Sequence, residues 1–227
     1  MKKYTTLLLD ADNTLLDFYA AEAAAIEKTC LRFGIPFSAE VASLYSAIND
    51  SMWKMLEKGE ITRDLLKVRR FEKFIKQMGA TADPKEVAAF YEDSLAQGAI
   101  LLPGADALCK RLSQHYELYI VTNGLKNVQR RRFAACGLAP YFKDVFISEE
   151  FGSQKPEKAF FDGVFAKLAE KDKTKVCIIG DSMSSDILGG INAGIDTCWF
   201  CKDGGAETYT PTYKAADFDE LLRLFIQ

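Results

Sequence analysis

Residues 5–14 read TTLLLDADNT, an apolar run that ends abruptly in two carboxylates, Asp10 and Asp12. Unbroken hydrophobic side chains of this kind are typical of a strand that is buried on both faces of a sheet. A basic start before an apolar run also resembles a secretory signal, but this run is short and meets Asp10 at once. We therefore expect a first strand over residues 5–9 and a polar loop directly after it.

The second half of the chain alternates between apolar runs and amphipathic segments. Its apolar runs lack polar alternation, which favours parallel strands covered by helices on both faces. Further strands are expected over 117–121, 144–148, 175–179 and 197–201, and helices over 105–112, 126–136, 158–169, 185–193 and 218–225. The pattern predicts an α/β fold with a Rossmann-like, doubly wound parallel sheet.

A helical block interrupts this pattern after the first strand. Helices are expected over 18–33, 39–58, 62–77 and 84–97. The last of them has a clear start, with Asp83 as cap, Pro84 at the first helical position and Glu86 three residues after the cap. We predict an α/β core made of residues 1–16 and 102–227, and an inserted four-helix domain of residues 17–101.

Composition narrows the classes of function. The chain has 227 residues, a formal net charge of −3 and a single histidine, His115, expected in an exposed turn. The chain lacks the excess of basic residues that is typical of nucleic-acid-binding proteins. No apolar run in it is long enough for a membrane span. The six scattered cysteines, without an export signal, suggest reduced thiols in the cytoplasm. With one histidine, carboxylates must carry most acid–base chemistry.

The predicted strands have apolar bodies and polar residues at their ends. Since ligands bind beyond the carboxyl ends of parallel strands, these residues should meet at one edge of the sheet. Several carboxylates gathered there would repel one another, and a divalent cation such as Mg²⁺ would relieve the conflict. The candidate residues are Asp10, Asp12, Thr122, Asn123, Gly124, Lys155, Asp181 and Asp186.

The arrangement resembles the haloacid dehalogenase (HAD) superfamily over essentially the whole chain. Four motifs occur in order: DxDx[TV] at residues 10–14, a Thr that ends the second strand at Thr122, a Lys before a Pro at residues 155–156, and GDxxxxD at residues 180–186. Asn13 stands where glycine is frequent, and asparagine tolerates unusual backbone angles.

The resemblance implies a role for each motif residue. Asp10 would attack phosphorus and form an aspartyl-phosphate, and Asp12 would act first as general acid and then as general base. Thr122 and Lys155 would bind phosphoryl oxygens. Mg²⁺ would be held by the Asp10 carboxylate, the Asp12 carbonyl, Asp181 and Asp186. An acid at position 12 favours phosphate esters, because a halide leaves without a proton.

Residues 186–194 and 197–199, together with Asp10 to Asp12 and Thr122-Asn123-Gly124, look like those of the bacterial pyrimidine 5′-nucleotidase group. The resemblance implies a small phosphorylated metabolite as partner, a pyrimidine nucleoside monophosphate, with Asn123 and Gly124 in the substrate site and a monomer or homodimer. It also makes the inserted helices a cap over the site. Phe18 could stack on the base or simply pack in the hinge.

Other interpretations stay open. A sugar phosphatase or phosphomutase would share the core and cap, whereas a catalytically silent interaction module would have no reason to keep the whole motif set. Cys198 and Cys201 match CxxC but belong to a predicted strand, which argues against a redox role. The basic runs at residues 67–70 and 130–132 are expected to be solvated helix faces.

Overall fold

The computed structural model describes residues 3–202 and 204–226, which form two compact units. One unit comprises Met1–Asp17 and Leu101–Gln227, and the other comprises Phe18–Ile100. The first contains every strand of the sheet and the second is helical. Each boundary lies one residue from the position expected from the sequence.

The core unit is built on a six-stranded parallel sheet in the order β3-β2-β1-β4-β5-β6. Its strands are β1 (Thr6–Leu9), β2 (Glu117–Thr122), β3 (Phe142–Ile147), β4 (Val176–Gly180), β5 (Asp196–Phe200) and β6 (Tyr213–Ala215). Its helices are α5 (Ala105–Ser113), α6 (Lys126–Ala135), α7 (Lys158–Lys167), α8 (Leu188–Ala193) and α9 (Phe218–Ile226). The predicted α/β class is confirmed.

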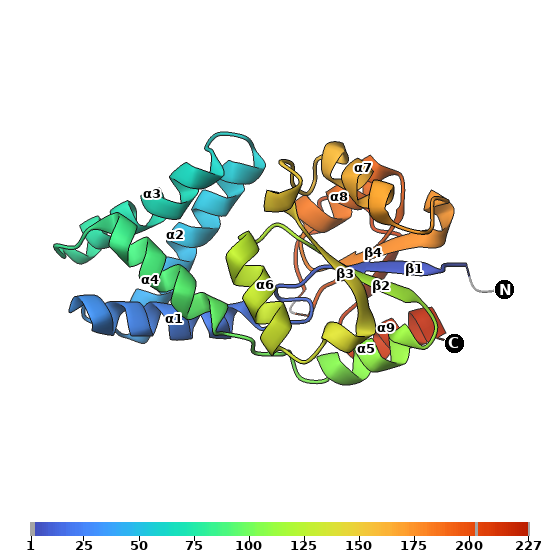
Figure 1. The fold of residues 1–227 in the computed structure, drawn as a ribbon, viewed down its shortest axis with the longest axis horizontal. Helices are drawn as coiled ribbons and strands as arrows, with labels where there is room; N and C mark the ends of the chain where they lie inside the picture. The colour runs from blue at the N-terminus through green and yellow to red at the C-terminus, as the bar shows by residue number, and fades with distance from the viewer. Residues whose placement is uncertain (1–2, 203, 227) are drawn as a thin grey trace. The chain divides into compact units, whose positions relative to one another are not determined.

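Helices cover both faces of the sheet, with α7 and α8 on one side and α5 and α9 on the other (Figure 1). The face under α7 and α8 is packed with large apolar side chains, among them Phe146, Phe160 and Phe161. Strand β1, in the middle of the sheet, is fully buried along its length. The apolar run that opens the sequence therefore forms the centre of the core.

The register of the sheet brings three strand ends together. Leu9, the last residue of β1, pairs with Ile120 of β2 and with Ile179 of β4. The chain segments that follow these strands consequently leave the sheet at the same edge. Asp10 and Asp181 belong to those segments, Thr122 is the last residue of β2, and parallel sheets bind ligands at this edge.

Two local features differ from the sequence prediction. The three-residue strand β6 (Tyr213–Ala215) was not predicted, because so short an edge strand has little pattern of its own. The helix predicted over 185–193 begins instead as a π-helical turn, Met183–Ile187, and continues as α8 (Leu188–Ala193). Such wide turns are frequent at functional sites, and this one contains Asp186.

The chain leaves the core for the helical insert and returns to it at two points that are neighbours in space. Leu16 forms an isolated antiparallel bridge with Leu101, and the Leu102 amide donates to the Leu15 carbonyl at 2.9 Å. All four residues belong to the core unit. The core therefore closes on itself at the point of insertion.

The helical unit consists of α1 (Phe18–Phe33), α2 (Ala39–Glu57), α3 (Arg63–Met78) and α4 (Pro84–Ala96). Side chains cap three of these helices: Ser38, Thr62 and Asp83 accept hydrogen bonds from amides in the first turns of α2, α3 and α4. Aromatic rings fill the space between the helices; the rings in mutual contact are those of Tyr45, Phe71, Phe74 and Tyr91.

A buried polar network also lies inside the helical unit. Asn49 donates to the Glu22 carboxylate at 2.8 Å and accepts from Arg70 at 3.1 Å, and Arg70 pairs with Glu92 at 3.2 Å. The guanidinium of Arg70 lies over the ring of Tyr91. With only 2% of Arg70 exposed, the prediction that residues 67–70 are a solvated basic run is wrong for this residue.

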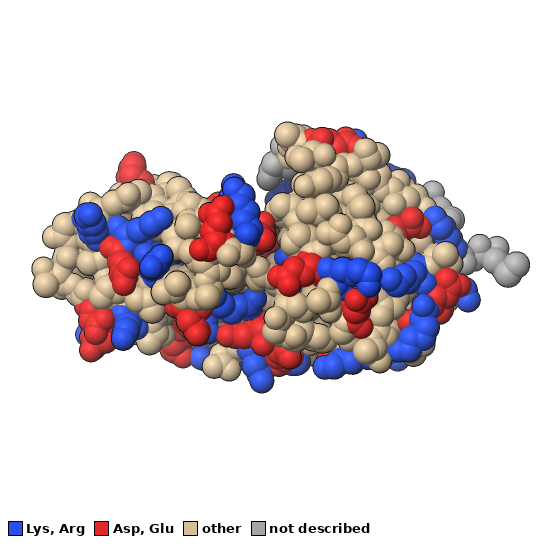
Figure 2. Space-filling model, turned by 90° about the horizontal axis from the view of Figure 1, so that it is seen from above, with Lys and Arg blue, Asp and Glu red and all other residues tan. Residues whose placement is uncertain are grey.

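Charged side chains of both signs are interspersed on the face drawn in Figure 2. Among the residues that the structure describes, no helix combines the length and the apolar composition needed to cross a bilayer. His115 is exposed, as predicted, and follows α5.

The buried carboxyl of Glu22 makes the stability of the helical unit depend on pH. Burial raises the pKa of Glu22 from 4.5 to about 7. The contribution of Glu22 to the free energy of unfolding is therefore fully present below pH 4.5 and is lost as the pH rises through about 7. We expect Glu22→Gln, which is neutral throughout, to become more stable relative to the unchanged protein above about pH 7, by about 1–3 kcal/mol. Urea unfolding across this pH range measures the difference.

Glu27→Gln is the matched control, because Glu27 is an exposed glutamate on the same helix. Parallel pH profiles for Glu22→Gln and the unchanged protein would contradict the expectation.

Candidate active site

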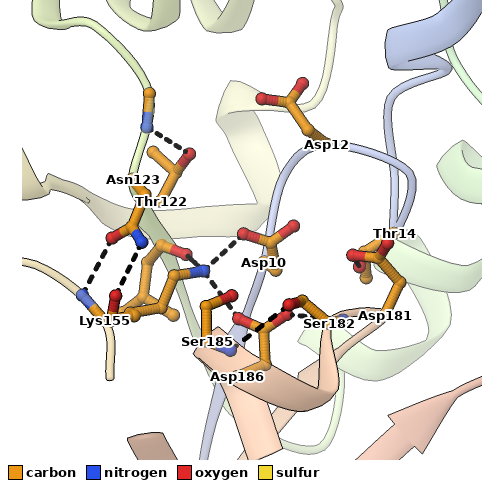
Figure 3. Close-up of polar contacts among 12 residues, drawn as sticks. Asp10, Asp12, Thr14, Thr122, Asn123, Lys155, Asp181, Ser182, Ser185 and Asp186 are labelled. Carbon is orange, nitrogen blue, oxygen red and sulfur yellow. Dashed lines mark hydrogen bonds and ion pairs between the residues drawn. The ribbon is translucent and has the colours of Figure 1, made fainter. Parts of the chain in front are cut away.

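Lys155 lies at the centre of the site and is 1% exposed. Its ammonium donates to Asp10 Oδ1 at 2.5 Å, to Asp186 Oδ1 at 2.6 Å and to the Val121 carbonyl at 2.8 Å (Figure 3). An ammonium has three hydrogens, and these three acceptors use all of them. The lysine thereby links the ends of β1 and β2 to the loop after β4.

The pKa values of Asp10, Lys155 and Asp181 all differ from their ordinary values. Burial raises the pKa of Asp10 well above its usual value; Lys155 opposes the shift, and Asp186 and Asp181 add to it. Burial alone would lower the pKa of Lys155, but Asp10 and Asp186 raise it above the ordinary value. Burial and the neighbouring Asp186 raise the pKa of Asp181 to about 7. Burial is the main cause of the shift in both acids, and the neighbouring carboxylates add to it.

The loop after β4 supplies two of these carboxylates. Asp186 accepts from the Ser182 amide at 3.1 Å, and the Ser182 side chain caps the turn by accepting from the Ser185 amide at 3.2 Å. Gly180 leaves room for the Asp186 side chain, since a Cβ at position 180 would lie 2.2 Å from the Asp186 carboxyl carbon. The glycine of the GDxxxxD motif is thus a steric requirement.

Asp181 is held from two directions. Thr14 Oγ1 donates to Asp181 Oδ1 at 3.4 Å, and the indole Nε1 of Trp199 on β5 donates to the Asp181 backbone carbonyl at 2.8 Å. Thr14 closes the first sequence motif. The preceding Asn13 has a φ of 58°, the left-handed conformation that asparagine was expected to tolerate.

Three carboxylates fit a divalent cation. Asp10, Asp181 and Asp186 each offer an oxygen, and these oxygens all lie within 4.8 Å of one another. Hard oxygen donors suit Mg²⁺, and three carboxylates meet only one ammonium, that of Lys155, so a cation would balance the remaining charge. The donor set and its electrostatics therefore match a Mg²⁺ site.

The residues that follow β2 are organised by short hydrogen bonds. The Asn123 side chain donates to the Lys155 carbonyl at 2.8 Å and accepts from the Lys155 amide at 2.9 Å. Asn123 thus holds the backbone from which Lys155 extends. Thr122 Oγ1 accepts from the Gly124 amide at 3.3 Å.

The Asp12 carboxylate does not belong to the group of three acids. In Figure 3 it extends away from Asp10. Its Oδ1 pairs with Arg132 and its Oδ2 accepts from Gln129 Nε2 at 2.8 Å. Both partners belong to α6 and are buried. The prediction that residues 130–132 form a solvated basic run is wrong for Arg132, which is fully buried.

The structure therefore brings together all the predicted core residues: Asp10, Asp12, Thr122, Asn123, Gly124, Lys155, Asp181 and Asp186. Phe18 begins α1 in the helical unit and contacts Tyr19 edge to face, so its role toward a substrate stays a prediction. The sequence interpretation missed Gln129, Arg132 and Trp199. The i, i+3 spacing of Gln129 and Arg132 was the available signal, since it puts both on one helix face.

The model of the haloacid dehalogenase-like hydrolase family matches residues 7–200, most of the chain. The chain belongs to this family. HAD-hydrolase YfnB of Bacillus subtilis is 40% identical over 226 residues, which cover 99% of this chain and 96% of that protein. A crystal structure of YfnB, described as bound to magnesium and as revealing interdomain movement, matches with a TM-score of 0.94 over the full length of both chains at 39% identity.

Two further relatives are named as pyrimidine 5′-nucleotidases. PynA of Streptococcus pneumoniae is 38% identical and the match covers 96% of this chain and 94% of PynA. YjjG of Escherichia coli is 32% identical, with 98% of each chain covered. The resemblance to HAD hydrolases deduced from four short motifs is confirmed, and the chain is a HAD hydrolase.

Protons and Mg²⁺ should compete for this site. Because the pKa of Asp181 is about 7 without metal, the affinity for Mg²⁺ should fall about tenfold for each pH unit below 7. Titration calorimetry between about pH 5.5 and about pH 8 measures this, and Asp181→Asn should abolish the binding. An affinity that does not change over that range would contradict the assignment of the site.

The hydrogen bond from Trp199 to the Asp181 backbone carbonyl should help to orient Asp181 as a Mg²⁺ ligand. Trp199→Phe removes the only hydrogen-bonding atom of the ring and should weaken Mg²⁺ binding about three- to tenfold, since outer-shell contacts orient the ligands. Calorimetry on Trp199→Phe and on Trp53→Phe, in α2 of the helical unit, makes the comparison. Equal affinities for the two variants would show that the contact has no such effect.

Proposed function

We propose that this HAD hydrolase is a Mg²⁺-dependent phosphatase that forms an aspartyl-phosphate on Asp10. One observation carries the proposal: the Asp10 carboxylate lies within hydrogen-bonding distance of Lys155 and within 4.8 Å of carboxylate oxygens of Asp181 and Asp186. A carboxylate in that position faces both a cation site and a fixed ammonium. A phosphoryl group could therefore be met by positive charge from two sides.

In the first half of the reaction, an oxygen of the Asp10 carboxylate attacks the phosphorus. The bond from phosphorus to the ester oxygen breaks, and Asp12 donates a proton to that oxygen as the alcohol leaves. The ion pair with Lys155 stabilises the ionised form of Asp10 that attack requires, in opposition to the effect of burial. When bound by Asp10, the Asp12 carbonyl, Asp181 and Asp186, the last directly or through water, Mg²⁺ neutralises charge on the phosphoryl oxygens.

In the second half, a water molecule attacks the phosphorus of the aspartyl-phosphate. Asp12, now ionised, takes a proton from the water, and the bond between phosphorus and the Asp10 oxygen breaks. Inorganic phosphate leaves and both aspartates return to their starting states. Thr122 binds a phosphoryl oxygen in both steps, and Lys155 does so by exchanging one of its three acceptors for a phosphoryl oxygen. The backbone at Asn123 and Gly124 lines the same part of the site.

The proposed substrates are pyrimidine nucleoside monophosphates. Support comes from PynA and YjjG, which match nearly the whole chain, including the helical insert. The N-acylneuraminate-9-phosphatase of mouse is 28% identical over only 61% of the chain, which makes a sugar phosphate the second candidate. We propose further that residues 17–101 form a cap that contacts the leaving group, with Phe18 against the base.

Phosphate release from a panel of nucleoside monophosphates and sugar phosphates tests the proposal. Turnover of uridine or deoxyuridine monophosphate should require Mg²⁺, stop with EDTA, and fall in Asp10→Asn by about 10⁴-fold or more, because the amide cannot act as the nucleophile. Glu27→Gln serves as a control far from the motifs. Turnover of sugar phosphates alone would keep the mechanism and change the substrate, whereas no release from any member would remove the phosphatase proposal.

A further inference from the structure

We propose that Gln129 and Arg132, one turn apart on α6, are positioning residues that hold the Asp12 carboxylate and aim the Thr122 hydroxyl at the phosphoryl group. The inference rests on the acid–base role proposed for Asp12. It adds two residues outside the four sequence motifs to the machinery of the reaction. It also gives a physical reason for the segment that follows the Thr122-Asn123-Gly124 motif.

The orientation of the Gln129 amide is set by its neighbours. Arg132 Nη1 donates to Gln129 Oε1 at 3.0 Å, and a guanidinium can only donate, so the amide oxygen must face it. The amide nitrogen then faces the other way. Gln129 Nε2 donates to Asp12 Oδ2 at 2.8 Å and to Thr122 Oγ1 at 2.8 Å. Both hydrogens of the Gln129 amide nitrogen are used, one for each residue.

The Thr122 hydroxyl is directed as a result. Its oxygen accepts from Gln129 Nε2 and, at 3.3 Å, from the Gly124 amide. A hydroxyl oxygen has two lone pairs, and two donors occupy both. The hydroxyl hydrogen is therefore left to donate to a third group. A phosphoryl oxygen, which only accepts, is the partner that this arrangement selects.

Asp12 is held by both of its oxygens. Arg132 pairs with Oδ1 and Gln129 binds Oδ2, so the carboxylate cannot rotate without breaking a charged or a neutral hydrogen bond. The Arg132 side chain is 1% exposed, whereas that of Asp12 is 25% exposed. The anchor is thus inside the protein and the held group faces solvent, as a residue that exchanges protons with a substrate must.

The backbone makes space for this network. A Cβ at Gly124 would lie 2.5 Å from the Gln129 Cγ, so a side chain there would push the glutamine out of place. Helix α6 begins at Lys126, two residues after Gly124, and holds Gln129 and Arg132 on one face. One short segment thereby couples the residue that binds the phosphoryl group with the one that serves the leaving group.

The test uses leaving groups that differ in their need for a proton. A nucleoside leaves as a strongly basic alkoxide unless it is protonated, whereas p-nitrophenolate leaves as a stable anion. Because kcat/KM covers only the steps up to release of the first product, it isolates the acid role of Asp12 from its later base role. The kcat/KM values for uridine monophosphate and p-nitrophenyl phosphate are compared, with Asp12→Asn as reference.

Arg132→Met should lower kcat/KM for uridine monophosphate about 10- to 100-fold and change that for p-nitrophenyl phosphate less than about threefold. Gln129→Met, which also releases Thr122, should lower both values, with a further loss of about tenfold for the nucleotide. Arg132→Lys, which keeps a cation, should recover part of the loss. Arg131→Met, at an exposed arginine on the same helix, is the matched control and should change neither value.

A misfolded variant would lose both substrates equally, so turnover of p-nitrophenyl phosphate by Arg132→Met reports the fold. Equal losses on both substrates in an Arg132→Met variant that unfolds thermally like the unchanged protein, beside a selective loss in Asp12→Asn, would overturn the positioning role and leave the proposed function intact. The absence of selectivity in Asp12→Asn itself would overturn the acid role on which the inference rests. If Asp10→Asn turned over the substrates as fast as the unchanged protein, the proposed function would instead be rejected.

Discussion

The ammonium of Lys155 is surrounded by Asp10, Asp186 and the carbonyl of Val121, and the polar edge of the sheet is organised around it. A buried charge is tolerated only when its partners are complete, because each removed partner leaves an uncompensated ion in a medium of low dielectric. The three acceptors come from β1, β2 and the turn after β4. All three contacts of Lys155 therefore depend on the register of the sheet and on the length of the loop that follows each strand.

Around this lysine the site divides into two networks. One contains Asp10, Asp181 and Asp186, whose oxygens lie within 4.8 Å of one another and match the donor set of a divalent cation. The other contains Asp12 and Thr122, held by Gln129 and Arg132 of α6. Asp10 and Asp12 are only two residues apart, yet they belong to different networks. Chemistry that needs one carboxylate as nucleophile and another as proton carrier requires such different surroundings.

The sequence predicted the parts of this arrangement whose signals are local. Apolar runs that end in polar residues located the strand ends, and caps such as Asp83 before Pro84 located helix starts. Arg70 and Arg132 were misjudged because a run of basic residues does not reveal which member faces a buried acid; Glu22, Asn49 and Asp12 are distant along the chain. The edge strand β6 and the π-helical turn at Asp186 likewise depend on tertiary contacts, which a single sequence does not display.

The antiparallel bridge between Leu16 and Leu101 has a consequence for how the fold can evolve. Since the two ends of the insert are already hydrogen-bonded neighbours within the core, the length of chain between them hardly affects the entropy of closing the sheet. A different insert could be grafted at the same two positions while Asp10, Lys155 and the other acids kept their places. Evolution could thus change what this scaffold acts upon by exchanging a single module, without rebuilding the reaction centre.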